Sequence, residues 1–258
     1  MSLGSLECGE QVFGLAVHPH RDLLAAGLID GRVTIFAPST AANLDAEDGV
    51  TPLVSLAAHS RSCRAVAFNA IGDTLYAAGS DGSLAVFDDQ GREKSRVQVS
   101  EVAVNKVVAA AGQSMVVVGD DEGGVRLLDA RSGETAVAWE EHEDFVSSLL
   151  TLDDDARLLS TAGDRTLCEY DLRSARPVRR SVEQEDELLC VQSLKLGRKL
   201  TCGALNGTVL IFSSTSLEDC SDRFPGHPAA VNCMLKVGTL HVLELSLIEV
   251  SRSTRARC

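Results

Sequence analysis

An eight-residue pattern recurs five times along the chain and constrains its fold more than any other feature. Each copy places a polar turn, usually with glycine, before a run of apolar residues. The copies are Ile29–Phe36, Ser80–Phe87, Asp121–Leu128, Gly163–Tyr170 and Leu205–Phe212. Their last residues lie 51, 41, 42 and 42 positions apart. A period near 42 residues is typical of architectures whose units bury their apolar surface against neighbouring units.

Each repeat unit predicts four short strands. An Asp-Gly or Asn-Gly pair supplies the positive φ angles of a tight hairpin turn. A strand of small residues precedes this turn, and an apolar strand follows it. In the fourth unit, the expected strands around the turn are Val146–Leu152, Leu158–Gly163 and Pro177–Val182. Four strands in every unit, without helical periodicity between them, predict an all-β protein made of β-propeller blades.

The repeat count predicts five complete blades and part of a sixth. The units end near residues 36, 87, 128, 170 and 212, and the sixth begins at His227 and loses the pattern after Val237. We therefore expect a propeller over residues 1–237 and a divergent tail over 238–258, with a surface loop between Ala37 and Pro52. In the tail, a single strand and a short amphipathic helix both fit Thr239–Val250. An incomplete ring would leave sheet edges unpaired unless the tail closes it.

The composition excludes several classes of function. The 258 residues include 24 Lys and Arg against 37 Asp and Glu, which gives a net charge of -13. Such a charge disfavours direct binding to phosphate backbones or anionic lipid. Apolar runs fall well short of the ~20 residues that a membrane span needs. The eight cysteines include no C-x-x-C pair, which favours buried thiols in a reducing, intracellular compartment.

The sequence predicts no enzyme, no cofactor and no metal. None of the patterns G-x-S-x-G, H-E-x-x-H and G-x-x-x-x-G-K-[ST] occurs in it. His18 and His20 flank Pro19 in an expected hairpin loop, and a metal there would need further ligands that the sequence does not place. We expect the protein to be a non-catalytic platform for partners.

The repeats resemble those of the WD-repeat family. Where that family ends the third strand of a blade in Trp-Asp, this chain has Phe87-Asp88, Leu128-Asp129 and Tyr170-Asp171. The family also places a histidine 22 residues before the turn aspartate, which matches two pairs, His59 with Asp81 and His142 with Asp164. The resemblance implies a buried hydrogen-bond network in which His142 links Asp164 to Ser160 and Tyr170, and a structural role for His59 and Asp81.

A narrower resemblance indicates a function. The segments that carry it are Phe13–Pro19, Arg21–Gly27, Cys63–Phe68, Gly119–Gly124 and Ser221–Phe224. They resemble a nuclear, nucleolar branch of the family implicated in ribosomal RNA synthesis and processing. The resemblance implies a scaffold for pre-ribosomal factors in the nucleus or nucleolus, while the cytoplasm stays open. Branch members continue through a seventh blade into a Lys-rich tail, which is not recognisable here, so the chain reads as truncated at its C-terminus.

An alternative interpretation comes from two loops. Leu128-Asp129-Ala130-Arg131 and Tyr170-Asp171-Leu172-Arg173 resemble the Trp-Asp-x-Arg box of WD-repeat substrate receptors. In those receptors the box docks the adaptor of a cullin-four-type ubiquitin ligase. Asp129, Arg131, Asp171 and Arg173 are therefore candidate docking residues, because a planar guanidinium suits acidic or carbonyl partners. An ion pair to a neighbouring loop is the structural alternative for each arginine.

Overall fold

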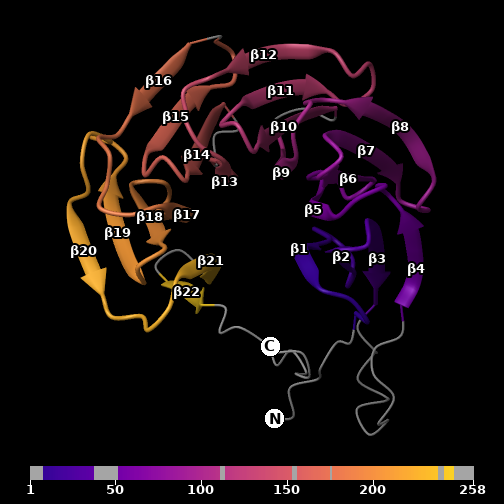
Figure 1. Cartoon of the computed structure of the whole chain (residues 1–258), viewed down its shortest axis with the longest axis horizontal. Coiled ribbons are helices and arrows are strands. Elements are labelled where there is room, and N and C mark those ends of the chain that lie inside the picture. The colour runs from indigo at the N-terminus through magenta and orange to yellow at the C-terminus, as the bar shows by residue number, and fades with distance from the viewer. Residues whose placement is uncertain are drawn as a thin grey trace, which may run out of the picture. The chain divides into compact units, whose positions relative to one another are not determined.

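A computed structural model describes residues 8–37, 52–110, 114–152, 156–174, 176–237 and 241–246 (Figure 1). The described residues form five four-stranded antiparallel sheets and one two-stranded sheet, and no helix. The predicted all-β class with four-stranded units is confirmed. The chain divides into two compact units, with the boundary after Ala109, and each is described by itself.

The first unit contains nine described strands. The first blade runs β1-β2-β3-β4 and the second runs β5-β6-β7-β8, so each blade is a meander of consecutive antiparallel strands. One further strand, β9, belongs to this unit. The bounds are β1 Val12–Val17, β2 Leu24–Leu28, β3 Arg32–Phe36, β4 Pro52–Ala57, β5 Cys63–Phe68, β6 Thr74–Gly79, β7 Ser83–Asp88, β8 Glu93–Gln98 and β9 Val104–Ala109.

The second unit contains thirteen described strands. The fourth blade runs β13-β14-β15-β16 and the fifth runs β17-β18-β19-β20, and the two lie side by side (Figure 1). The bounds are β10 Met115–Asp120, β11 Val125–Asp129, β12 Thr135–Trp139, β13 Val146–Thr151, β14 Arg157–Ala162, β15 Leu167–Asp171, β16 Pro177–Arg180, β17 Leu188–Leu194, β18 Lys199–Ala204, β19 Thr208–Ser213, β20 Asp222–Pro225, β21 Val231–Val237 and β22 His241–Ser246.

The hairpin between the second and third strands of a blade depends on a residue with positive φ. Gly82 fills this position in the second blade with φ of 77°, and a Cβ there would stand 2.1 Å from the Ser100 carbonyl oxygen. In the fourth blade Arg165 takes the same place with φ of 68°. The fourth hairpin therefore carries the left-handed strain that glycine avoids elsewhere.

Apolar side chains pack between neighbouring blades of each unit. In the first unit, Ala25, Val33 and Leu56 of the first blade meet a second-blade set made of Cys63, Val66, Leu75, Ala77, Ala85 and Phe87. In the second unit, Leu159 and Leu167 meet Leu188, Val191, Leu200 and Phe212 in the same way. A single sheet could not bury both faces, so the repeated sequence unit is stable only when stacked.

The C-terminal part of the repeat pattern forms a hairpin. β22 pairs antiparallel with β21 along the whole of its length. Of the two alternatives for this segment, the structure therefore contains the strand. The expected loop over 38–51 and the tail from 247 onward lie outside the described residues. Among the residues that are described, no helix is long and apolar enough to cross a membrane.

Candidate functional site

The fourth blade encloses His142 in a hydrogen-bond network. His142 precedes β13, and its Nδ1 lies 3.0 Å from Asp164 Oδ2 in the β14–β15 turn. Its Nε2 lies 2.6 Å from the Ser160 hydroxyl in β14, which in turn donates to the Tyr170 hydroxyl at 3.3 Å. The structure thus brings together all four residues that the family resemblance named. The network ties the start of the blade to its central hairpin.

Sequence reasoning missed one member of this network. The Thr166 hydroxyl lies 3.1 Å from His142 Nδ1 and donates to Asp164 Oδ1 at 2.7 Å. Ser83 occupies the same place in the second blade, two residues after the turn aspartate. Aligning the repeats would have revealed this member, because both blades have a hydroxyl residue two positions after the turn aspartate.

The charges of the fourth network are fixed by two opposing effects. Burial lowers the pKa of His142, but the hydrogen bond and charge of Asp164 together with contacts to Cys168 raise that pKa to about 9. Burial likewise raises the pKa of Asp164, while His142 and the hydrogen bonds from Thr166 and the Glu143 backbone together bring it down to about 2. At neutral pH the two side chains form a buried imidazolium–carboxylate pair. Burial also raises the pKa of Tyr170 well above its usual range, so its hydroxyl stays neutral.

The network borders the only tryptophan of the sequence. Trp139, at the end of β12, is 2% exposed, and its ring centroid lies 4.9 Å from that of Tyr170 at an interplanar angle of 43°. The indole Nε1–H has no hydrogen-bond partner among the described residues. Trp139 is therefore a packing group of the second unit, held on an outer strand against the aromatic end of the network.

The second blade contains a smaller version of the network. His59 Nδ1 lies 3.1 Å from Asp81 Oδ1 and 3.0 Å from the Ser83 hydroxyl. Ala77 and Phe87 stand where the fourth blade has Ser160 and Tyr170. The buried His59 Nε2 consequently finds no hydrogen-bond partner in the described part of the chain.

The two histidines also differ in charge. Burial lowers the pKa of His59 by more than the Asp81 carboxylate raises it. Burial raises the pKa of Asp81, but hydrogen bonds from Ser83 and Ser60 and the proximity of His59 lower it to about 2. His59 is neutral at physiological pH and donates its Nδ1–H to Asp81. In both blades the turn carboxylate also accepts backbone N–H groups, so its lone pairs serve the fold.

The candidate docking residues lie in matching loops of the third and fourth repeats. Asp129 Oδ1 accepts the Arg131 backbone N–H at 2.9 Å, and Asp171 Oδ1 accepts that of Arg173 at 2.9 Å. The Arg173 guanidinium binds the Asp171 carboxylate of its own loop with two hydrogen bonds of 2.8 Å, and its side chain is 74% exposed. These bonds lower the pKa of Asp171 to about 2. Arg131 is exposed as well.

His18 and His20 lie in the β1–β2 hairpin, where main-chain groups occupy their ring nitrogens. His18 Nδ1 accepts the backbone N–H groups of His20 and Arg21, and its Nε2 donates to the Gly72 carbonyl at 2.9 Å. His20 Nε2 lies 3.0 Å from the Ala70 carbonyl. Within the described residues, no group of three or more His, Cys, Asp and Glu side chains is arranged to hold a metal ion.

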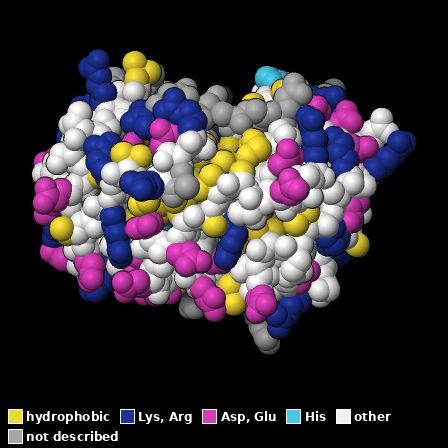
Figure 2. Space-filling model, turned by 90° about the horizontal axis from the view of Figure 1, so that it is seen from above, with side chains coloured by type: hydrophobic (Ala, Val, Ile, Leu, Met, Phe, Trp, Pro, Cys, Tyr) yellow, Lys and Arg dark blue, Asp and Glu magenta, His cyan; other side chains and the backbone are white. Residues whose placement is uncertain are grey.

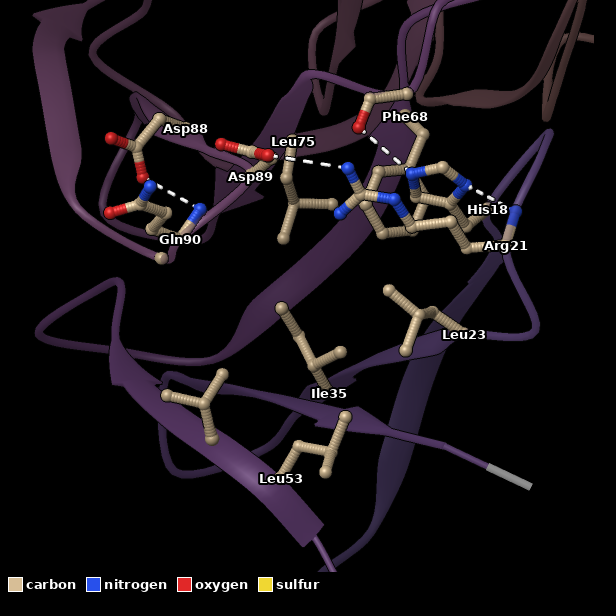
Figure 3. A pocket seen from close by; sticks show the side chains of 13 residues that line it. His18, Arg21, Leu23, Ile35, Leu53, Phe68, Leu75, Asp88, Asp89 and Gln90 are labelled. Atoms are coloured by element: carbon tan, nitrogen blue, oxygen red, sulfur yellow. Dashed lines mark hydrogen bonds and ion pairs between the residues drawn. The ribbon is translucent and has the colours of Figure 1, made fainter. Parts of the chain in front are cut away.

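A cavity of about 200 Å³ lies beside His18, in the first unit (Figure 3). Sequence reasoning did not find it, because the segments that form it are far apart in the chain. Apolar side chains line its interior and polar side chains from two hairpins stand at its mouth. The lining residues are His18, Arg21, Leu23, Ile35, Leu53, Val54, Phe68, Gly72, Leu75, Asp88, Asp89, Gln90 and Gly91.

Comparisons with known proteins agree with the repeat structure. The family model "WD domain, G-beta repeat" matches residues 50–88, which include the second blade up to β7. The chain is 35% identical to WD repeat-containing protein 55 of Arabidopsis thaliana over 235 residues, 90% of this chain and 65% of that protein. It is 34% identical to WD repeat-containing protein 55 of Homo sapiens, over 87% of this chain and 57% of that protein.

A fungal relative gives the same result. The chain is 32% identical to WD repeat-containing protein JIP5 of Coprinopsis cinerea, over 89% of this chain and 55% of that protein. The chain thus spans about 55 to 65% of the length of these curated relatives. The four-stranded units, the His–Asp pairs and these similarities lead to one assignment. The chain has the four-stranded blades of a WD-repeat β-propeller, and it is similar to WD repeat-containing protein 55 along 90% of its length.

Proposed function

We propose that this chain is a non-catalytic protein-interaction scaffold that acts in nucleolar ribosome biogenesis, in the synthesis or processing of ribosomal RNA. The observation that carries this proposal is the similarity to WD repeat-containing protein 55 along 90% of the chain. The nucleolar role is what the family resemblance of the sequence implies. The His142 and His59 networks support a scaffold role, because their polar side chains hydrogen-bond to one another and to the backbone and so stabilise the blades.

The surface charge favours protein partners over direct contact with RNA. The net charge of -13 repels a phosphate backbone at long range. On the face that Figure 2 presents, basic and acidic side chains are interspersed. The scaffold would thus reach pre-ribosomal particles through their proteins.

Co-fractionation tests this proposal. We expect the tagged full chain to sediment with pre-ribosomal particles on a sucrose gradient, and a fluorescent-protein fusion to gather in nucleoli. An Asp164→Ala variant, which breaks the network of the fourth blade, is the control that shows whether co-sedimentation requires a folded chain. Sedimentation of the soluble, folded chain only at the top of the gradient would refute the assignment to ribosome biogenesis.

A second candidate function is that of a substrate receptor for a cullin-four-type ubiquitin ligase. The observation that favours it is the pair of exposed arginines, Arg131 and Arg173, on loops with the same aspartate cap. We expect the double variant Arg131→Ala, Arg173→Ala to lose co-purification with the ligase adaptor. The matched control changes two other exposed arginines, Arg176→Ala and Arg198→Ala. Retention of the adaptor by the first double variant excludes this docking mode.

A further inference from the structure

The cavity of the first unit has the size of one side chain. Its volume of about 200 Å³ exceeds the ~150 Å³ of a cavity that holds benzene. It is smaller than the roughly 300–1,000 Å³ of sites for cofactors and drug-sized ligands. Leu23, Ile35 and Leu53 project into it from the first blade (Figure 3), and Phe68 and Leu75 face them from the second. An aliphatic or aromatic side chain fits this interior by size and polarity.

The walls of the cavity are formed before any partner binds. The His18 ring joins the β1–β2 hairpin to the Gly72 carbonyl of the β5–β6 hairpin. Gly72 has φ of 82°, and a Cβ there would stand 2.3 Å from the His18 ring. On the other side, Asp88 Oδ1 accepts the backbone N–H groups of Gln90 and Arg92 at 2.9 and 2.8 Å. A pre-organised site of this kind pays little ordering entropy on binding.

An edge strand runs beside the cavity. β4 pairs with β3 on one side, and no other described strand pairs with it on the other. Two of its residues, Leu53 and Val54, line the cavity, and Leu53 is 61% exposed. An exposed edge offers main-chain donors and acceptors to an extended polypeptide, and an adjacent pocket selects one of its side chains.

The charged residues that line the cavity are two aspartates and one arginine. Asp88 and Asp89 stand there against Arg21, whose Nη2 lies 3.4 Å from Asp89 Oδ2 (Figure 3). The Arg21 and Asp89 side chains are 57% and 38% exposed, and an ion pair so exposed contributes only about 0–1 kcal/mol. A partner cation can therefore replace Arg21 on Asp89. The net charge of -13 also draws basic partners toward the chain.

We propose that this cavity docks an extended, basic segment of a partner protein, which inserts one Leu, Ile, Met or Phe side chain between the hairpins. The main chain of the segment lies along β4, and a Lys or Arg next to the anchor pairs with Asp89. This inference deepens the proposed scaffold function, on which it rests, by naming the chemistry of one partner. The site lies at the blade ends opposite the Asp-Gly turns.

Selection from a phage-displayed library of random twelve-residue peptides on the purified full chain tests this proposal. We expect the selected peptides to share one large apolar residue flanked by Lys or Arg. In isothermal titration calorimetry, Leu53→Asp should weaken a selected peptide about tenfold or more, because the anchor loses its apolar contact. Asp89→Asn should weaken it several-fold, while Arg21→Ala should leave it unchanged or tighten it, since Arg21 competes for Asp89.

Two matched variants control for indirect effects. Val178→Asp places the same charge at a similarly exposed apolar position of β16, and Glu101→Gln removes one exposed carboxylate of the first unit away from the cavity. Both should bind as the wild type does. The proposal is overturned if no peptide binds, if selected peptides lack the pattern, or if Leu53→Asp binds like Val178→Asp.

The outcomes separate this inference from the proposed function. Peptide binding that depends on Leu53, in a chain that does not sediment with pre-ribosomal particles, would retain the docking site and remove the ribosomal assignment. Co-sedimentation that is unchanged in Leu53→Asp, together with failure of peptide selection, would retain the scaffold and remove this site.

Discussion

The second and fourth blades hold a histidine and an aspartate at the same spacing, yet their networks differ. In the fourth blade, His142 is bonded through both ring nitrogens and is protonated. In the second, His59 uses only Nδ1 and is neutral. The missing bond of His59 Nε2 comes from Ala77, which stands where the fourth blade has Ser160. The charge difference has other causes: contacts with Asp164 and Cys168 raise the pKa of His142, whereas Arg96 adds to the effect of burial and lowers the pKa of His59. The conserved spacing of a repeat therefore fixes the geometry of a pair without fixing its charge.

The largest expected effect is the loss of the turn aspartate in the fourth blade. Asp164→Ala leaves a buried imidazolium, the Thr166 hydroxyl and two backbone N–H groups without their acceptor, and should cost about 3–5 kcal/mol in the free energy of unfolding. Asp81→Ala should cost less, because neutral His59 keeps no unpaired charge. Urea unfolding of the two variants measures the difference. Equal losses would show that the two histidines carry the same charge.

The pH dependence of stability should have opposite signs in the two blades. Because the pKa of His142 is raised to about 9, its contribution is complete below pH 6.5 and is lost as the pH rises through about 9. Because the pKa of His59 is lowered, its contribution is complete above pH 6.5 and is lost as the pH falls below that value. Each slope is at most about 1.4 kcal/mol per pH unit.

Melting temperatures of His142→Gln and His59→Gln between pH 5 and 10 measure these slopes. The difference between wild type and His142→Gln should shrink on the alkaline side, and that for His59→Gln on the acidic side. Two difference curves with the same sign would contradict the assigned charges.

The smallest expected effect is a gain. Ala77→Ser places a hydroxyl near the unpartnered Nε2 of His59 and should add about 1 kcal/mol of stability. Ala78→Ser, one residue further along β6 and equally buried, gives the matched control, because its side chain points to the face of the sheet opposite that of Ala77. Calorimetric melting of both variants measures the change. A loss of stability in Ala77→Ser as large as in Ala78→Ser would mean that the serine does not reach His59.

Much of the fold was predictable because the strands and turns of each repeat depend on residues that are close together in the sequence. The Asp-Gly turns, the small-residue strands and the polar outer strands each follow from residues within a few positions. The His–Asp pairs were predictable for a related reason, since the repeat fixes their spacing of 22 residues. The unsatisfied Nε2 of His59 was not read from the sequence, although Ala77 carries that signal at the offset of Ser160.

Other features depend on contacts between distant segments. The cavity forms where the β1–β2 hairpin, the outer strand β4 and the β7–β8 hairpin meet, and Arg21 and Asp89 are 68 residues apart. No local pattern marks such a site, because each lining residue is an ordinary hairpin or strand residue in its own unit. The strained Arg165 is similar: the usual glycine is absent there, but only the backbone shows that the turn keeps its positive φ.

The position of Trp139 gives a fluorescence signal for one contact of the second unit in solution. It is the single tryptophan of the sequence, 2% exposed, and it lies against the Tyr170 ring. Its emission should shift to longer wavelength when the contact between β12 and β15 opens to water. Loss of strands that leaves the β12–β15 contact intact keeps that emission unchanged, whereas circular dichroism records every strand that is lost. Comparing the two signals during one denaturation shows whether this contact opens together with the other sheets or apart from them.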